Sequence, residues 1–244
     1  MREERGGDYF AVYIPHDVFP RVRAVSWAMR GGGFVSPRVI VNHSTNGLWI
    51  DDIEDYVNGF IRGHRFPEEA VVMVTTVPQG FRGTAERSAG SIAVRVHATV
   101  GLGNALAAGD PVTLPRIGTI NTIVLIDAAL SDAACLESIA IATEAKAGFL
   151  AARGVRSTVS GRIATGTGTD CTAVVALGHP ADGQDASRRP VLSYAGKHTL
   201  LGKLVAEAVA DAVRDAMADS LARRAAGIAA STEIGDDIPR THSL

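Results

Sequence analysis

The chain has 244 residues, of which 46% are hydrophobic and 20% are charged, close to the average of globular proteins. Its formal net charge of −2 gives no support for binding to nucleic acids or to anionic membranes. Two cysteines cannot form a disulfide framework, and no apolar run reaches the roughly 20 residues that a membrane span needs. We therefore expect a globular protein of the cytoplasm, with no secretory signal at its N-terminus.

Short apolar runs predict strands along the first half of the chain. The runs at 9–14, 38–43 and 70–77 are apolar and rich in β-branched residues. The segment 91–100 alternates apolar with polar or small residues, which is the period of a half-buried strand. Between the second and third runs, 50–62 carries apolar residues at helical spacing and predicts an amphipathic helix.

A strand followed by a long helix is predicted in the middle of the chain. The apolar run at 119–126 is typical of a buried strand, and Ser131 offers an N-cap oxygen to a helix that begins at Asp132. We expect this helix to end near Arg153, because Gly154 suits the left-handed position that follows many helices.

The same order is predicted again toward the C-terminus. A strand at 173–177 precedes a polar loop at 178–190, and an alanine-rich helix with one apolar face covers 198–228. The polar segment 231–244 is expected to be a flexible tail. With no internal repeat and no linker, the sequence predicts a single domain over 1–230 of the α+β class, a layered mixed β-sheet covered by long helices.

A run of alternating glycine and threonine precedes the strand predicted at 173–177 and consists of Thr165, Gly166, Thr167, Gly168, Thr169 and Asp170. Its hydroxyls and unshielded N–H groups can hold an oxyanion or an amide oxygen. Asp170 can then be a general base or orient a hydroxyl nucleophile. The alternative is a structural turn, in which the threonine and aspartate side chains bond neighbouring backbone.

Polar side chains also occur in otherwise apolar segments. Asn42, Asn104 and Asn121 lie at the ends of apolar runs or in a glycine-rich loop, where a carboxamide can pair with an amide of a ligand or satisfy nearby backbone. Glu144 lies within the helix predicted to begin at Asp132, and it either faces solvent, pairs with a cation or belongs to a site.

The seven histidines are scattered, and none has the spacing of a metal-binding pair, so we expect no metal of the protein's own. His198 lies at the start of the last predicted helix. The helix dipole favours its neutral form there, which suits a general base, and an ordinary surface histidine fits the position equally well.

Several blocks of the sequence, taken in order, resemble the adenosylcobinamide amidohydrolase (CbiZ) family over nearly the whole chain. They lie at 39–42, 99–105, 118–121, 143–146, 164–170 and 196–199. The resemblance implies hydrolysis of the amide that joins the aminopropanol arm to the corrin ring of adenosylcobinamide. The product would be adenosylcobyric acid, in corrinoid salvage. The partner is then a corrinoid substrate that brings its own cobalt, and no cofactor is required.

From this resemblance and the reaction that it implies, we predict two sets of site residues. The catalytic residues, which activate water or a threonine hydroxyl and move the proton, are Glu144, Thr167, Thr169, Asp170 and His198. The substrate-binding residues are Asn42, Asn104, Thr119, Asn121, Lys146, Thr165, Gly166, Gly168, Lys197 and Thr199. Asn121 and the N–H groups of the glycine loop would stabilise the oxyanion, and Lys146 or His198 would protonate the departing amine. Candidates for an apolar rim, each also open to ordinary packing, are Trp27, Phe34, Trp49 and Phe81.

Two other functions fit the same residues. One is the cleavage of a different large amide-bearing ligand, such as a siderophore or a secondary metabolite, and the other is a non-catalytic module that binds corrinoids or metal complexes. The apolar face of the last predicted helix also makes a homodimer possible.

Overall fold

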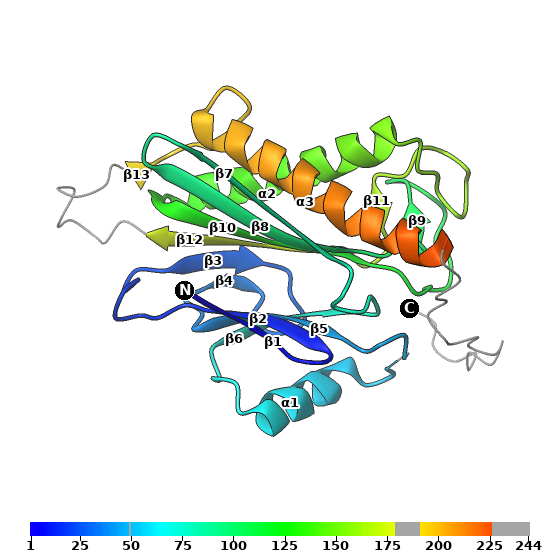
Figure 1. Ribbon diagram of the computed structural model, residues 1–244, viewed down its shortest axis with the longest axis horizontal. Coiled ribbons are helices and arrows are strands. Elements are labelled where there is room, and N and C mark those ends of the chain that lie inside the picture. The colour runs from blue at the N-terminus through cyan, green and yellow to red at the C-terminus, as the bar shows by residue number, and fades with distance from the viewer. Residues whose placement is uncertain (49, 179–190, 226–244) are drawn as a thin grey trace.

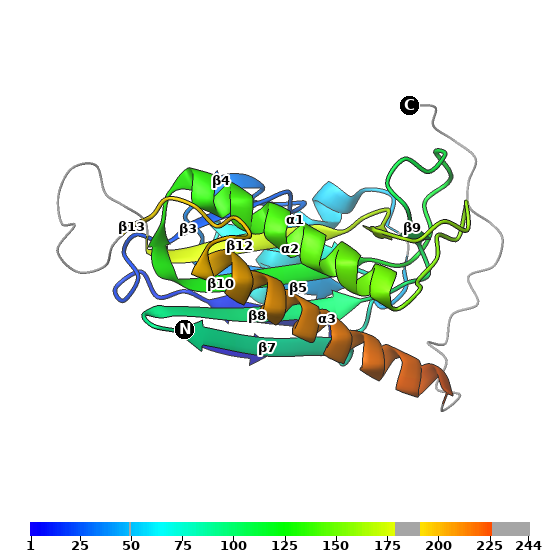
Figure 2. The same ribbon diagram turned by 90° about the horizontal axis from the view of Figure 1, so that it is seen from above.

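The computed structural model describes residues 1–48, 50–178 and 191–225, which form two β-sheets stacked face to face between helices (Figure 1). Helices α2 (Asp132–Ala152) and α3 (Leu200–Ala225) cover the outer face of the larger sheet and lie side by side across it (Figure 2). Helix α1 (Ile53–His64) covers the outer face of the smaller sheet. The layers are therefore helix, sheet, sheet and helix, and the predicted layered α+β class is confirmed.

The smaller sheet has four strands, in the order β1 (Arg2–Arg5), β2 (Tyr9–Tyr13), β5 (Val39–Ser44) and β6 (Ala70–Thr75). Neighbours are antiparallel except β5 and β6, which run parallel because α1 returns the chain between them. Asp52 caps α1 by accepting a hydrogen bond from the Asp55 N–H at 2.9 Å. The helix therefore begins at Ile53, three residues after the predicted start.

The larger sheet has the order β4 (Gly33–Val35), β3 (Arg23–Ser26), β12 (Cys171–Gly178), β10 (Ile120–Leu130), β8 (Ile92–Val100) and β7 (Arg82–Ala89), and β13 (Val191–Leu192) also pairs with β10. Strands β10 and β12 are parallel, with α2 between them in the chain. A small separate ladder joins β9 (Ala105–Leu106) to β11 (Gly166–Thr167). The predicted cap and stop of α2 are confirmed, because Ser131 accepts from the Ala134 N–H at 3.1 Å and Gly154 has a φ of +64°.

Three apolar layers hold the sheets and helices together. The layer between the two sheets includes Phe10, Ile40, Met73, Ile123 and Val175, all at most 1% exposed. A second layer joins the larger sheet to α2 and α3, and a third joins the smaller sheet to α1. The central strands are thus buried on both faces, which explains their continuous apolar sequence.

The apolar face of α3 is buried within the chain rather than free for a partner. Leu201, Val205, Val209 and Val213 pack on the larger sheet and on α2 and are at most 1% exposed. This face is therefore not available to form a homodimer, and the homodimer itself stays a prediction. The predicted loop at 178–190 begins at the last residue of β12, and its residues 179–190 lie outside the described residues, as does the tail at 231–244. The described part of α3 ends at Ala225.

His97 in β8 is buried between the two sheets, with its side chain 1% exposed and its Nδ1 3.0 Å from the Thr84 hydroxyl. Burial, reinforced by the charges of Arg82, Arg95 and Arg5, lowers the pKa of His97 to about 3 from 6.5. The folded state therefore requires the neutral form of the His97 side chain.

We predict that this histidine makes the protein sensitive to acid. The unfolded chain takes up a proton at His97 near pH 6.5, and the folded chain does not. The contribution of neutral His97 to the free energy of unfolding is therefore complete above pH 6.5 and is lost as the pH falls toward 3. The contribution to the slope of unfolding free energy against pH approaches about 1.4 kcal/mol per pH unit. Urea denaturation at several pH values should give a shallower acid slope for His97→Gln. Equal slopes for both proteins would contradict the prediction.

Candidate active site

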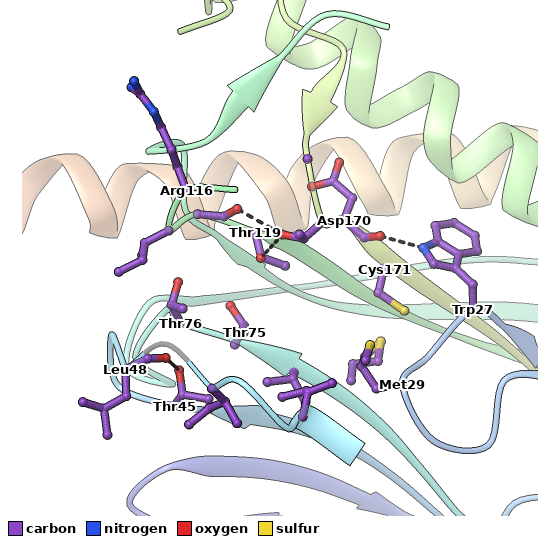
Figure 3. A pocket seen from close by; sticks show the side chains of 18 of the residues that line it. Trp27, Met29, Thr45, Leu48, Thr75, Thr76, Arg116, Thr119, Asp170 and Cys171 are labelled. Atoms are coloured by element: carbon purple, nitrogen blue, oxygen red, sulfur yellow. Dashed lines mark hydrogen bonds between the residues drawn. The ribbon is translucent and has the colours of Figure 1, made fainter. Parts of the chain in front are cut away.

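A cleft of about 600 Å³ opens between the two sheets, where β3, β5 and β6 end and where β10 and β12 begin (Figure 3). Most of its wall is apolar, from Trp27, Met29, Leu48, Ile50, Met73 and Ile117 among others. Hydroxyl groups interrupt that wall and come from Thr45, Thr75, Thr76, Thr119 and Thr169. A mainly apolar cleft with a few polar groups that converge is the usual form of a small-molecule site.

Two of these hydroxyls are directly paired. The Thr169 Oγ1 lies 2.6 Å from the Thr119 Oγ1 and 3.3 Å from the Gly118 carbonyl oxygen. Thr119, just before β10, is 5% exposed, whereas Thr169, just before β12, is exposed on the cleft wall. The parallel pairing of β10 with β12 brings these two threonines together. The pair can pass a proton from one hydroxyl to the other.

Asp170 holds this part of the cleft in place. Its Oδ1 accepts from the Ile120 N–H at 3.0 Å and from the Thr167 hydroxyl at 2.5 Å, and its Oδ2 accepts from the Thr167 N–H at 3.1 Å. The same Oδ2 forms an ion pair with Lys146 of α2, and the two side chains are 10% and 6% exposed. The carboxylate is therefore engaged by four donors, and its geometry is that of a positioning group rather than of a free general base.

The glycine positions of the sequence allow three loops to meet at the cleft. A Cβ on Gly168 would lie 2.6 Å from the Asn104 Nδ2, and one on Gly118, where φ is +140°, would lie 2.5 Å from the Asn104 backbone nitrogen. The Gly168 N–H donates to the Asn104 carbonyl oxygen at 3.2 Å. Only glycine permits this approach of backbone to backbone. Gly166 lies in β11, and Thr165 beside it accepts from the Ala108 N–H at 3.0 Å.

The two asparagines in the sheets form a bridge behind the cleft. The Asn121 Nδ2 donates to the Asn42 Oδ1 at 2.8 Å and to the Val74 carbonyl oxygen at 3.0 Å, and the Asn42 Nδ2 donates to the Thr99 hydroxyl at 3.1 Å. Asn121 is 1% exposed and its Oδ1 has no partner in the described part of the chain. In this arrangement its N–H groups join the sheets and are not aimed at an oxyanion.

A second group of predicted residues lies away from the cleft. Glu144 pairs with Lys197 at 2.5 Å, and the two side chains are 53% and 69% exposed. Glu144 is two positions from Lys146 and so projects from the opposite side of α2. His198 is exposed, and the Thr199 hydroxyl caps α3 by accepting from the Gly202 N–H at 2.9 Å. The structure therefore does not bring these four residues to the Thr119–Thr169 pair.

Of the predicted rim aromatics, Trp27 lines the cleft and donates its Nε1–H to the Asp170 carbonyl oxygen at 2.6 Å. Phe34 and Phe81 are not among the cleft residues, and Trp49 lies outside the described residues. Sequence reasoning missed the contributions of Met29, Leu48 and Arg116 to the wall. They lie in the loops that follow β3, β5 and β9, where no periodic pattern marks them.

One buried cysteine, Cys171, lies among the residues of the cleft wall. Burial raises the pKa of the Cys171 thiol to about 12, so it lacks the thiolate character of a nucleophile at neutral pH. Across 1–48, 50–178 and 191–225, no three or more histidine, cysteine, aspartate or glutamate side chains are grouped to hold a metal ion. None of the helices in those ranges has the length and apolar character needed to cross a bilayer.

A cleft between stacked sheets, with paired hydroxyls and a glycine-built loop in its wall, has the form of a site for hydrolysis of a polar bond. The chain belongs to the adenosylcobinamide amidohydrolase (CbiZ) family, whose model matches residues 8–225. The resemblance identified from the sequence blocks is thus confirmed, and the description of that family supports the prediction of an enzyme that hydrolyses amide bonds.

Among curated proteins, the uncharacterized protein MJ1613 of Methanocaldococcus jannaschii is 36% identical over 101 residues. That match covers 41% of this chain and 35% of the relative, so the chain spans about a third of the length of the curated relative it matches.

Similar solved structures include the PH0078 protein of Pyrococcus horikoshii OT3, with a TM-score of 0.50 and 14% identity over 86% of this chain and 77% of that one. A Burkholderia sp. beta-aminopeptidase has a TM-score of 0.48 and 16% identity, over 88% and 81% of the two chains. The L-aminopeptidase D-Ala-esterase/amidase of Ochrobactrum anthropi has a TM-score of 0.46 and 16% identity, over 86% and 77%. At 14% identity, the likeness to the Pyrococcus protein shows a shared fold and no more.

We predict strong energetic coupling between Lys146 and Asp170. Asp170→Asn leaves a buried ammonium group without its counter-charge and should cost about 3–5 kcal/mol of unfolding free energy. Replacing both partners, as Lys146→Met with Asp170→Asn, should cost about 2 kcal/mol less than the sum of the single changes. Urea denaturation of the four proteins measures this coupling.

The exposed Glu144–Lys197 pair is the matched control for this cycle. Glu144→Gln and Lys197→Met should show a coupling below about 1 kcal/mol, because solvent screens the pair. Additive losses at Lys146 and Asp170, within about 0.5 kcal/mol, would contradict the role given to their ion pair.

Proposed function

We propose that this protein hydrolyses the amide between the aminopropanol arm and the corrin ring of adenosylcobinamide, giving adenosylcobyric acid and aminopropanol. The observation that carries the proposal is the meeting of two family blocks, 118–121 and 165–170, at one cleft with a hydroxyl pair in its wall. The family match over 8–225 supports the same reaction.

The character of the cleft suits this substrate. Its volume of about 600 Å³ falls within the roughly 300–1,000 Å³ of small-molecule sites and has room for the amide-bearing arm of a corrinoid. An apolar wall interrupted by hydroxyls fits a substrate in which an apolar ring carries polar amide arms. The cobalt enters as part of the substrate, so the protein's own residues are left to bind the arm and to move protons.

We assign the attack on the amide carbonyl to the Thr169 hydroxyl. As its oxygen bonds to the carbonyl carbon, its proton passes to the Thr119 oxygen at 2.6 Å, and Thr119 gives its own proton to the amine nitrogen as the C–N bond breaks. Water then hydrolyses the ester, which gives the carboxylic acid and restores the Thr169 hydroxyl. The two threonines thus return to their starting state.

The surrounding residues position this pair. Asp170, with Lys146, fixes the turn that carries Thr169, and Asn104 holds the backbone of Gly168. We place the reaction in the cytoplasm, and the two buried free thiols, Cys135 and Cys171, suit such a reducing compartment.

The test is incubation with adenosylcobinamide, cobinamide and pseudocobalamin, followed by mass analysis for the loss of aminopropanol. We expect release from adenosylcobinamide. Thr169→Val, which keeps the shape of the side chain and removes its hydroxyl, should lower kcat about 100-fold or more. Thr169→Ser, which keeps the hydroxyl, should retain turnover within about tenfold.

Glu144→Gln is the matched control, because this residue is 53% exposed and lies outside the cleft. We expect it to keep full turnover. Loss of turnover in Glu144→Gln with normal turnover in Thr169→Val would contradict the assignment. Binding of cobinamide without any release of aminopropanol would favour a corrinoid-binding module, and no binding of any corrinoid would favour a different substrate.

A further inference from the structure

Large apolar side chains are exposed around the mouth of the cleft. Trp27 is 48% exposed, Met29 56%, Leu48 59% and Ile117 37%, and all four line the cleft. Exposed side chains of this size are costly to hydrate, so their concentration at one opening points to an apolar occupant. We name these four residues the apolar collar.

The collar lines the same cleft as the hydroxyl pair. In Figure 3, Thr119 lies between Leu48 on one side and Trp27 and Met29 on the other. Thr119 itself is 5% exposed, whereas the collar side chains are at least 37% exposed. Within the hydroxyl pair, Thr119 is thus less exposed than the apolar surface around it, whereas Thr169 is open to an arm that enters the cleft.

Hydrogen bonds hold the collar in two places, at the Trp27 side chain and at the Leu48 backbone. The Trp27 Nε1–H donates to the Asp170 carbonyl oxygen at 2.6 Å, which ties one side of the mouth to the residue after Thr169. On the other side, the Leu48 N–H donates to the Thr45 carbonyl oxygen at 3.1 Å, and the Thr45 hydroxyl donates to the Leu48 carbonyl oxygen at 2.8 Å. A surface preorganised in this way loses little entropy when a ligand covers it.

The size of the cleft indicates how a corrinoid would be oriented. A volume of about 600 Å³ is that of a site for a drug-sized molecule. A corrin ring with its arms and adenosyl ligand is larger than such a molecule and cannot enter whole. The arm with the scissile amide is small enough to enter the cleft and reach Thr119 and Thr169.

We propose that the substrate ring stays outside, with its apolar face on the collar, while the aminopropanol arm extends between the sheets to the hydroxyl pair. This inference rests on the proposed function and adds to it the site that recognises the ring. The collar residues do not touch the reacting bond, so they bind the ground state and the transition state equally.

The experiment compares two double variants as full-length proteins. Met29→Ser with Leu48→Ser removes apolar surface from the collar and leaves Trp27 and its hydrogen bond intact. The matched control is Leu136→Ser with Leu200→Ser, two leucines that are 53% and 45% exposed and lie outside the cleft, on α2 and α3. Thermal unfolding verifies that each variant is folded, and both turnover of adenosylcobinamide and equilibrium binding of cobinamide are measured.

We expect the collar variant to raise KM by about 10-fold or more, to weaken cobinamide binding by a similar factor and to keep kcat within about threefold. The control should match the wild type in all three quantities. Unchanged KM and binding in the collar variant would overturn the inference and leave the proposed function standing. A loss confined to kcat would also overturn it, because the side chains would then act on the reaction.

The two proposals can fail separately. If the wild type binds cobinamide and releases no aminopropanol, the proposed function is wrong, and weaker binding by the collar variant still supports the ring site. If the wild type neither binds nor cleaves corrinoids, both proposals are wrong.

Discussion

The site depends on one carboxylate, that of Asp170, whose side chain is only 10% exposed. Asp170 accepts from the backbone N–H groups of Ile120 and Thr167 and from the Thr167 hydroxyl, and it pairs with the Lys146 ammonium. These contacts connect a long helix, the start of a central strand and the glycine–threonine turn. Because a buried charge is tolerated only when it is fully paired, the turn has one stable arrangement, and that arrangement sets Thr169 against Thr119.

The stacking of the two sheets explains why this arrangement is open to a ligand. The sheets share a continuous apolar layer in their centre, and the Asn42–Asn121 bridge joins them near one end. Beyond that bridge the strands of both sheets end or begin, and the loops that follow diverge to form the cleft. The cleft thus forms where strands of the two sheets end or begin. Its hydroxyls come from threonines that flank strands, such as Thr45, Thr76 and Thr119.

Much of the fold was predictable because the strongest patterns are local. The helix over 132–152 follows from an N-cap serine, an apolar run and a stop glycine, and the central strands follow from continuous apolar sequence. The strand β7 was not predicted, since Gly83 and Ala85 are its small buried residues and α3 supplies the contact that fixes it. The presence of two sheets rather than one depends on pairings between distant segments, which no local pattern encodes.

The candidate site was predictable in part for the same reason. The glycine–threonine turn indicates an unusual backbone conformation. Close packing of loops is indicated by Asn104 together with Gly118 and Gly168. The sequence could not separate Lys146 from Glu144, because only the rotation of α2 against the sheet decides which of them reaches Asp170 and which reaches solvent. Of the exposed collar it indicated Trp27 alone, because Met29, Leu48 and Ile117 share no spacing.

The central claim is that the amide is cleaved in the cleft between the sheets. A crystal structure of Thr169→Val with adenosylcobinamide bound tests it most directly, because the substituted protein should hold the substrate without consuming it. The account predicts the carbonyl carbon of the arm amide within contact of residue 169 and of the Thr119 hydroxyl, with the ring at the mouth. An arm amide bound instead on the outer face of α2 and α3, beside Glu144 and His198, would contradict it.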